Sequence, residues 1–385
     1  MQHERTPKLN RQTPDAHKAR GLVRRLLAWF KANARDLPWR RTRDPYAIWI
    51  SEIMLQQTQV KTVIPYWRRW RRELPTARSL ARARPEKVLK LWEGLGYYTR
   101  ARNLQQAARI IVKEYRGRFP EDFDTVLALP GVGRYTAGAI CSIAFNQPTP
   151  ILDGNVIRVL TRLFGIDGNP RERSTHARLW QLAEALVGEA AEAQLGRARN
   201  CSHLNQALME LGATICLPRQ PDCLSCPVQR ECVAWLKGRV AELPNLGLRL
   251  KPTERRFVAF VAERRGRFLV RQRPAGVVNA HLWEFPNVEV NGHASNTRRL
   301  ARNLLGVCPR SLEPLLRVRH TITRYRVTLD AFHMAFSRAT PAALGPGTWC
   351  SLDQCRKLAF PSAHRKILAT LEKQNSCESR RTARN

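Results

Sequence analysis

Four cysteines near the middle of the chain have a residue type and spacing that suit a metal site. They are arranged as Cys216-x6-Cys223-x2-Cys226-x5-Cys232. Zinc sites usually pair two CxxC units, whereas this group contains a single one. The spacing also differs from those common in ferredoxins. The pattern therefore predicts a metal centre and leaves zinc and iron–sulfur both open, with four buried structural thiols as the alternative.

Glu52 is a candidate acid because its neighbours between Ile48 and Leu55 are mostly apolar. Burial among such residues disfavours the carboxylate and raises the pKa, so that the group remains a proton donor near neutral pH. A solvent-exposed glutamate on the polar side of a helix is the alternative. The polar run Gln56-Gln57-Thr58-Gln59 follows, and its uncharged groups suit contacts with base edges.

The segment Leu129-Pro130-Gly131-Val132-Gly133 lies between two helical stretches, 123–128 and 135–145. Glycines in a tight turn let the backbone approach another surface closely, and the free N–H groups of the next helix attract a phosphate. The pattern predicts a helix–hairpin–helix motif that grips one DNA backbone without reading bases. A plain turn between two helices also uses glycine and is the alternative.

A second carboxylate, Asp153, follows this motif in the run Ile151-Leu-Asp-Gly-Asn-Val156. Since a helical pattern begins immediately after it, one role for Asp153 is to cap that helix. A carboxylate between a phosphate-gripping turn and a new helix would also lie near the sugar of bound DNA. There it would stabilise positive charge that develops on the sugar.

The charge balance favours a polyanionic partner. The 385 residues include 66 Lys+Arg and 31 Asp+Glu, for a net charge of +35. Such a surface attracts nucleic acid first and anionic membrane second. No apolar run is long enough for a membrane span, and the polar first residues do not resemble a signal peptide. We therefore expect an intracellular protein bound to DNA rather than to membrane, with cysteines that are thiols or metal ligands.

The periodicity of apolar residues divides the chain into two domains. From Ala16 to about Cys216 the spacing is helical, and after residue 253 it changes to strand-like alternation, with a hairpin at Arg264–Gly266. We predict a mostly α domain at 16–233, a linker at 234–253 and a smaller α+β domain at 254–372. We expect disordered tails at 1–15 and 373–385.

Several segments together resemble the MutY-type adenine DNA glycosylases of the helix–hairpin–helix superfamily, which also contains endonuclease III. The segments are LPWR (37–40), SEIMLQQTQV (51–60), LWEGLGYYTRARNL (91–104), LPGVGRYTAGAI (129–140), ILDGNVIRVL (151–160) and the cysteine spacing at 216–232. The resemblance implies an N-terminal helix–hairpin–helix glycosylase domain with a [4Fe–4S] cluster held by the four cysteines. It also implies a monomer that acts on double-stranded DNA containing adenine opposite 8-oxoguanine or guanine.

The resemblance assigns the catalytic roles residue by residue. Glu52 matches the general acid that protonates adenine N7, and Asp153 matches the carboxylate that stabilises the sugar cation. Tyr135 matches a supporting hydroxyl and Asn155 a site-orienting amide. Endonuclease III has a lysine at the position of Tyr135, which a phenol cannot replace as a Schiff-base nucleophile. The resemblance therefore implies a glycosylase with little or no lyase activity.

The same resemblance assigns residues that bind the substrate. Arg40 and Gln206 fall where the family surrounds the extruded adenine. Gln57 and Tyr97 fall where it fills the gap in the duplex. The glycines of the hairpin, Gly131 and Gly133, fall where it grips the backbone.

The C-terminal segments around Gln272 and Trp283-Glu-Phe-Pro286 resemble the Nudix-like domain that recognises 8-oxoguanine in this family. The recognition loop usually reads Phe-Ser-His and here reads Ile322-Thr323-Arg324. Thr323 keeps a hydroxyl for the lesion, while Arg324 replaces an imidazole with a fixed cation. The domain lacks the clustered glutamates of a Nudix hydrolase, so we expect no pyrophosphatase activity.

Two other functions remain alternatives. One is a glycosylase of the same fold that removes a different base, such as thymine from a T·G pair, although a pyrimidine has no N7 to protonate. The other is a DNA-binding iron–sulfur protein that has lost catalysis, which the presence of both Glu52 and Asp153 disfavours.

Overall fold

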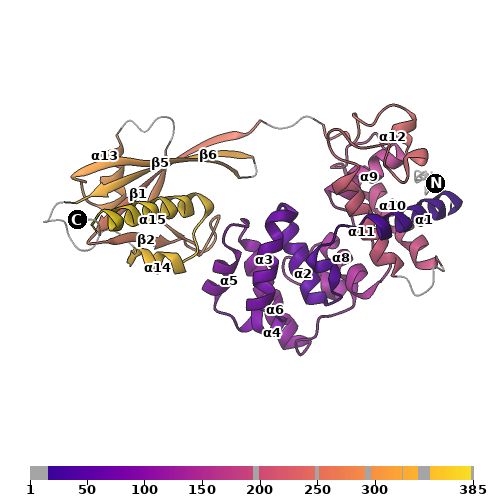
Figure 1. Ribbon diagram of the computed structural model, residues 1–385, viewed down its shortest axis with the longest axis horizontal. Helices are drawn as coiled ribbons and strands as arrows, with labels where there is room; N and C mark the ends of the chain where they lie inside the picture. The colour runs from indigo at the N-terminus through magenta and orange to yellow at the C-terminus, as the bar shows by residue number, and fades with distance from the viewer. Residues whose placement is uncertain are drawn as a thin grey trace, which may run out of the picture. The chain divides into compact units, whose positions relative to one another are not determined.

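The computed structural model describes residues 16–193, 199–247, 251–290, 296–322, 324–336 and 347–382 of the chain. It forms two compact units, whose helices and strands are shown in Figure 1. The first unit comprises Met1–Ala81 and Gln106–Arg249, and the second comprises Arg82–Gln105 and Leu250–Asn385. The second unit thus combines the C-terminal part of the chain with a short segment from its helical part.

The first unit is helical, and its described residues contain no strand. Its elements are α1 (Ala16–Asn33), η1 (Pro38–Arg41), α2 (Pro45–Leu55), α3 (Val60–Glu73), α4 (Ala77–Arg82), α7 (Phe123–Leu127), α8 (Arg134–Phe145), α9 (Gly154–Phe164), α10 (Arg173–Glu192), α11 (Asn200–Thr214), η2 (Gln229–Glu231) and α12 (Val233–Leu236). The long helix α6 (Thr99–Glu114) continues from the second unit into the first.

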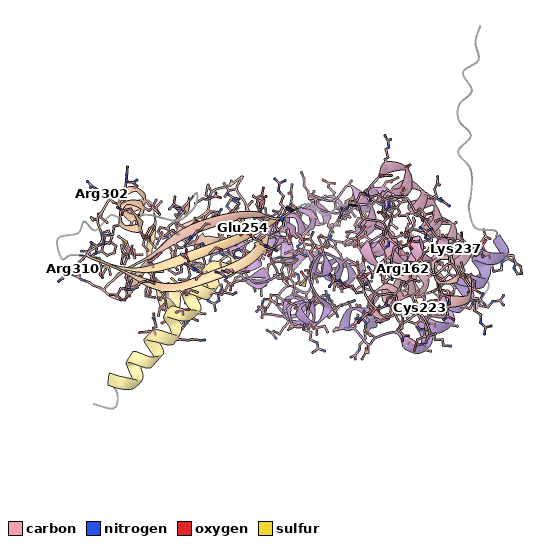
Figure 2. The ribbon with its side chains drawn as sticks, turned by 90° about the horizontal axis from the view of Figure 1, so that it is seen from above. Arg162, Cys223, Lys237, Glu254, Arg302 and Arg310 are labelled. Carbon is pink, nitrogen blue, oxygen red and sulfur yellow. The ribbon has the colours of Figure 1, made fainter. Side chains whose placement is uncertain are left out.

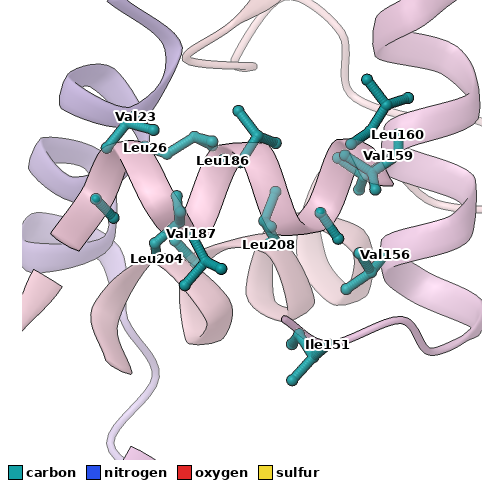
Figure 3. Close-up of a cluster of buried hydrophobic side chains, with 14 of the residues drawn as sticks. Val23, Leu26, Ile151, Val156, Val159, Leu160, Leu186, Val187, Leu204 and Leu208 are labelled. Carbon is teal, nitrogen blue, oxygen red and sulfur yellow. The ribbon is translucent and has the colours of Figure 1, made fainter. Parts of the chain in front are cut away.

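The core of the first unit lies among α1, α9, α10 and α11. On α9, the buried residues Val156, Val159, Leu160 and Leu163 recur with the spacing of one helix face. Figure 3 shows Ile151 and Val156 in one cluster of buried side chains with Leu186 and Val187 of α10 and Leu208 of α11. Because Ile151 and Val156 are both anchored in this core, Asp153 between them is held at a fixed place.

Two helices begin at a proline, one of them after a capping aspartate. Asp44 caps α2, its side chain accepting from the Tyr46 N–H, and Pro45 is the first helical residue. Pro85 likewise begins α5 (Pro85–Trp92) in the second unit. The cap positions α2 so that its buried residues, Glu52 among them, face the interior of the first unit.

The second unit is built on a mixed sheet with the strand order β3-β2-β1-β6-β5, with β4 paired to β1 and β7 to β2. Its strands are β1 (Thr253–Arg264), β2 (Arg267–Gln272), β3 (Trp283–Glu284), β4 (Asn287–Val290), β5 (Ser311–Ile322), β6 (Tyr325–Ala335) and β7 (Thr348–Ser351). Its C-terminal helices are α13 (Thr297–Leu305), α14 (Leu352–Lys357) and α15 (Ser362–Thr382).

Both faces of this sheet are covered by helices. Along β1, Ala259 and Val261 pack with Ile367 and Leu368 of α15, whereas the alternate residues Val258 and Phe260 pack with Ala301 of α13. Such a strand is apolar on both sides, as expected for a central strand between two helical layers. The predicted fold class, a helical N-terminal domain followed by a smaller α+β domain, is confirmed.

Two segments differ from the sequence-based expectation. Helix α15 continues to Thr382, through most of the predicted tail at 373–385, because half of the residues at 373–382 are Lys, Gln, Glu or Arg, which favour a helix, and no Gly or Pro interrupts them. Part of the predicted linker at 234–253 is folded: Leu243 is buried, and its carbonyl accepts from Arg162 Nε at 2.8 Å. The predicted tail at 1–15 and the site residue Thr323 lie outside the described residues. Among the described helices, none is long and apolar enough to cross a membrane.

Candidate active site

A single cavity of about 820 Å³ in the first unit collects most of the residues that the sequence singles out. Its lining combines side chains from η1, α2, α8, α9 and α11. The predicted site residues on its wall are Arg40, Glu52, Gln57, Tyr135, Asp153, Asn155 and Gln206. The fold therefore brings together residues that are far apart in the chain.

Glu52 lies on the buried side of α2 with only 5% of its surface exposed. The hydroxyl of Tyr135 on α8 donates to Glu52 Oε2 at 2.8 Å. Burial raises the pKa of Glu52 to about 7, with a further contribution from the negative charge of Asp153 and a partial offset from the Tyr135 hydrogen bond. Glu52 thus has the protonation behaviour of a general acid near neutral pH.

Asp153 is both a helix cap and a wall residue of the cavity. Its Oδ1 accepts from the Val156 N–H at 2.8 Å, and its Oδ2 accepts from Asn155 Nδ2 at 3.0 Å. Burial raises the pKa of Asp153, and the hydrogen bonds from Val156 and Asn155 act in the opposite direction. The two roles considered for Asp153 are therefore compatible, because the cap itself supplies donors that favour the carboxylate.

Asn155 is fixed by an arginine that sequence reasoning missed. Arg158, one turn further along α9, donates from Nη2 to Asn155 Oδ1 at 2.8 Å and to the Gly212 carbonyl at 2.6 Å. Its Nε donates to the carbonyl of Cys216 at 2.7 Å. A side chain at Gly212 would come within 2.6 Å of Asn155 Cβ, so glycine is needed for α11 to approach α9. Arg158 thus ties the Asp153 cap to the start of the cysteine segment.

A second buried glutamate, Glu210, also lines the cavity. Arg35 donates to both of its carboxylate oxygens, at 2.7 and 2.8 Å, and Arg40 Nη2 donates to Oε2 at 2.8 Å. Burial alone would raise its pKa, but these hydrogen bonds outweigh burial and lower the pKa of Glu210 to about 2. The sequence carried a signal for Glu210, because it too stands in a largely apolar helix four residues after Gln206.

Gln206 and Arg40 also line the cavity. Gln206 is buried, and its Nε2 donates to Ser202 Oγ at 3.1 Å. Arg40 is held by Glu210 and also donates to the carbonyl of Arg35 at 3.0 Å. These contacts place fixed donors and an amide carbonyl beside the cavity, as needed to bind a polar heterocycle.

The glycine turn joins α7 to α8 as predicted. Gly131 has a positive φ of 77°, a conformation that favours glycine, and Gly133 precedes the first residue of α8. Both glycines are exposed, whereas Val132 between them is buried and anchors the turn. The free N–H groups at the start of α8 therefore face solvent, where a phosphate can approach.

Two further predicted residues lie on turns with unusual backbone conformation. Gln57 is exposed at the end of α2 with a φ of 56°. Tyr97 belongs to the second unit, has a φ of 45° and is 41% exposed. A positive φ is uncommon for a residue with a side chain and often marks a functional position.

The four cysteines Cys216, Cys223, Cys226 and Cys232 line one small pocket of the first unit together with Arg162. Figure 2 labels Cys223 and Arg162 in this region. Arg162 Nη1 donates to Cys216 Sγ at 3.4 Å. The described residues contain no group of three or more His, Cys, Asp or Glu arranged around a single ion.

Comparisons with known proteins agree with this arrangement. Residues 50–185 match the model of the HhH-GPD superfamily of base excision DNA repair proteins, and residues 257–370 match that of the NUDIX domain. A thermostable thymine-DNA glycosylase of known structure is 33% identical with a TM-score of 0.51, covering 58% of this chain and all of that chain.

Relatives of known function match nearly the whole chain. The adenine DNA glycosylase of Rattus norvegicus is 38% identical over 408 residues, which cover 91% of this chain and 77% of that protein. The adenine DNA glycosylase of Buchnera aphidicola subsp. Schizaphis graminum is 31% identical over 89% of this chain and 96% of that protein. With a glycosylase fold, a Nudix-like C-terminal domain and these relatives, the chain belongs to the adenine DNA glycosylase family.

Proposed function

We propose that this chain releases adenine from duplex DNA in which it is paired with 8-oxoguanine or guanine. The observation that carries the proposal is the presence in one cavity of Glu52, whose pKa is raised to about 7, and Asp153, which is held by hydrogen-bond donors. Breaking an N-glycosidic bond needs one carboxyl group that gives up a proton and one that stays ionised.

Glu52 acts first, as the acid. Adenine is a poor leaving group as an anion, so protonation at N7 lets the bond to the sugar break early. The Tyr135 hydroxyl, at 2.8 Å from Glu52, stays with the carboxylate after it has lost its proton and stabilises it. The negative charge of Asp153 then stabilises the oxocarbenium-like sugar until a water molecule adds to the sugar. The family resemblance implies that this stabilisation includes a transient covalent bond between Asp153 and the sugar. Asn155 keeps the carboxylate of Asp153 in place.

The other residues of the wall hold the extruded base. Arg40 and Gln206 bind adenine after it has left the stack, which costs a few kcal/mol. Glu210 fixes the guanidinium of Arg40 through a hydrogen bond of 2.8 Å. Gly131 and Gly133 grip the phosphate backbone through the N-terminus of α8, and Gln57 and Tyr97 fill the gap left in the duplex.

The four cysteines hold a [4Fe–4S] cluster in this proposal. Their shared pocket and the guanidinium of Arg162 at 3.4 Å from Cys216 Sγ support it. When bound, the cluster supplies a fixed anchor for the segment 216–232. The second unit, with Thr323 and Arg324 in its recognition loop, reads the 8-oxoguanine opposite the adenine.

The acid role of Glu52 is tested by the substitution Glu52→Gln, which keeps the shape of the side chain and removes its proton. We expect the release of adenine from an A·8-oxoguanine duplex to fall below detection in single-turnover assays, while affinity for the duplex remains. The control is Glu189→Gln, on the first unit but outside the cavity lining. Full activity of the Glu52→Gln variant would overturn the acid assignment.

A T·G duplex assayed in parallel separates adenine release from the thymine-directed alternative. Release of thymine rather than adenine would favour a base specificity like that named for the structurally similar glycosylase.

The absence of a lysine at position 135 predicts little strand cleavage. We expect borohydride to trap almost no covalent complex with an A·8-oxoguanine duplex, because a phenol cannot form the required Schiff base. An endonuclease III-type lyase assayed with its own substrate serves as the positive control. Efficient trapping by this chain would contradict a glycosylase without lyase activity.

A further inference from the structure

The loop Gly94–Tyr98 has a strained backbone at Tyr97. Gly94 and Gly96 have φ values of 105° and 70°, which glycine adopts readily. Tyr97, which follows Gly96, has a φ of 45°. For a tyrosine such a backbone conformation costs free energy and persists only when surrounding contacts enforce it. The loop must therefore be held in place by neighbouring residues.

Part of that support comes from residues flanking the loop itself. Trp92 Nε1 donates to the Gly96 carbonyl at 3.0 Å, and Arg100 Nη2 donates to the carbonyls of Leu95 and Gly96 at 2.9 and 3.2 Å. The guanidinium of Arg100 also lies over the rings of Trp92 and Tyr97. These contacts fix the shape of the loop but do not fix it to another part of the second unit.

Further support comes from the segment Leu358–Phe360, which precedes α15. Glu93 Oε1 accepts from the Phe360 N–H at 2.9 Å, and the Tyr98 hydroxyl donates to the Phe360 carbonyl at 3.2 Å. Lys90 Nζ donates to Glu93 Oε2 at 2.6 Å and to the Leu358 carbonyl at 2.8 Å. Both ends of the strained loop are thus bound to one short stretch of backbone.

The segment 358–360 is in turn part of the framework of the sheet. The Ala359 carbonyl accepts from the N–H of Trp283 on β3 at 2.8 Å, and the ring of Phe360 stacks on Phe285 at 5.8 Å between centroids. Phe360 is fully buried. The loop is therefore attached to a rigid part of the second unit rather than to a surface strand.

We propose that Glu93 is a positioning residue through which the Nudix-like sheet holds Tyr97 ready for insertion into the duplex. The side chain of Glu93 is only 12% exposed. It accepts hydrogen bonds both from the backbone N–H of Phe360 and from the ammonium group of Lys90. The inference rests on the proposed function, because it concerns the residue that fills the gap left by the extruded adenine.

The test is a double-mutant cycle between Glu93 and Tyr97 in the full-length protein. The probe is an A·8-oxoguanine duplex with 2-aminopurine beside the adenine, whose fluorescence rises when its neighbour leaves the stack. We expect Glu93→Ala to lower the equilibrium constant for this rise about tenfold, the size expected from losing a charge-assisted hydrogen bond. In a Tyr97→Ala background the same substitution should cause no further loss.

Conservative and control variants separate positioning from general damage to the fold. Glu93→Gln keeps an acceptor for the Phe360 N–H and should recover most of the fluorescence change. Glu372→Gln is the matched control, because Glu372 is paired with Arg365, as Glu93 is, and also with Arg356 of α14. An equal loss from Glu93→Ala in both Tyr97 backgrounds, or no loss in either, would overturn the proposal.

Failure of the positioning role and failure of the proposed function give different results. If the wild-type protein released no adenine but the fluorescence rise still depended on Tyr97 and Glu93, the function would be wrong and the positioning role supported. If adenine were released normally while Glu93→Ala left the fluorescence rise unchanged, the positioning role alone would be wrong.

Discussion

Two regions of one cavity contain a buried glutamate each, yet the two carboxyl groups have opposite pKa shifts. Glu52 is 5% exposed and Glu210 is 1% exposed. The pKa of Glu52 is raised to about 7, whereas that of Glu210 is lowered to about 2. At neutral pH the first is therefore partly protonated, whereas the second is ionised.

The difference lies in the partners and not in the burial. Burial raises the pKa at both positions. Glu52 receives one hydrogen bond from the neutral hydroxyl of Tyr135, while Glu210 receives donors from two guanidinium groups, Arg35 and Arg40. A neutral donor leaves burial dominant and two cations reverse it. The same residue type thus serves as a proton donor at one position in the cavity wall and as a fixed anion at another.

The largest expected effect is on the free energy of unfolding, when Glu210 loses the two arginines, Arg35 and Arg40, that pair with it. The double substitution Arg35→Met and Arg40→Met leaves a carboxyl group buried without a partner, which typically costs about 3–5 kcal/mol. We expect a loss of this size in the free energy of unfolding at neutral pH, measured by urea denaturation. Adding Glu210→Gln should restore much of it, because the unpaired charge is then gone.

A triple variant as unstable as the double variant would show that the arginines stabilise the protein by packing rather than by charge. Arg25→Met is a matched control, because Arg25 pairs with Glu231 on the first unit and does not line the cavity.

The second prediction uses the opposite pKa shifts to separate the two glutamates by pH. The folded-state pKa of Glu52 lies above its ordinary value of 4.5, so its contribution to stability is present below pH 4.5 and is lost as pH rises through about 7. The shift corresponds to about 3 kcal/mol as an order of magnitude. Glu210 has the reverse sign: its contribution is present above pH 4.5 and is lost as pH falls towards 2.

Urea denaturation between pH 4 and pH 8 checks this prediction. Glu52→Gln should flatten the decline in stability relative to wild type between pH 4.5 and 7, while Glu210→Gln should leave that decline unchanged. An identical pH dependence in wild type and Glu52→Gln would contradict the raised pKa of Glu52.

The contrast between these two glutamates also shows what the sequence can predict. Glu52 is identifiable because it stands among Ile50, Ile53 and Met54 and within a segment that resembles a known family. Glu210 stands in a comparable setting, but its role depends on Arg35 and Arg40, which lie more than a hundred residues away in the chain. A local pattern reports burial, whereas the sign of a pKa shift depends on partners that only the fold brings together.

The fold was predictable to a similar degree. The change from helical to strand-like periodicity near residue 253, the helix starts at Pro45 and Pro85 and the hairpin at Arg264–Gly266 all follow from local residue patterns. The inclusion of Arg82–Gln105 in the second unit does not, because it depends on contacts such as Glu93 with Phe360 across a long chain separation. Local sequence likewise cannot show that Leu243, in the predicted linker, is buried beside Arg162.

The smallest effect expected concerns the acid limb of the pH–rate profile, and it extends the comparison to Asp153. Single-turnover release of adenine should decline above pH 7 as Glu52 loses its proton and decline at low pH as Asp153 gains one. Asn155→Ala removes the amide that donates to Asp153 Oδ2 at 3.0 Å, a hydrogen bond that lowers the pKa of this carboxyl group. Losing it should cost about 1 kcal/mol, which moves the acid limb upward by less than about one pH unit.

The alkaline limb should stay near pH 7 in this variant, because the Tyr135 contact that bears on Glu52 is unchanged. Asn169→Ala, in a loop of the first unit away from the cavity, should leave both limbs unchanged. If Asn155→Ala lowered the whole profile without moving the acid limb, Asn155 would orient Asp153 without affecting its charge. In that case hydrogen-bond partners would set the ionisation of Glu52 and Glu210 but not that of Asp153.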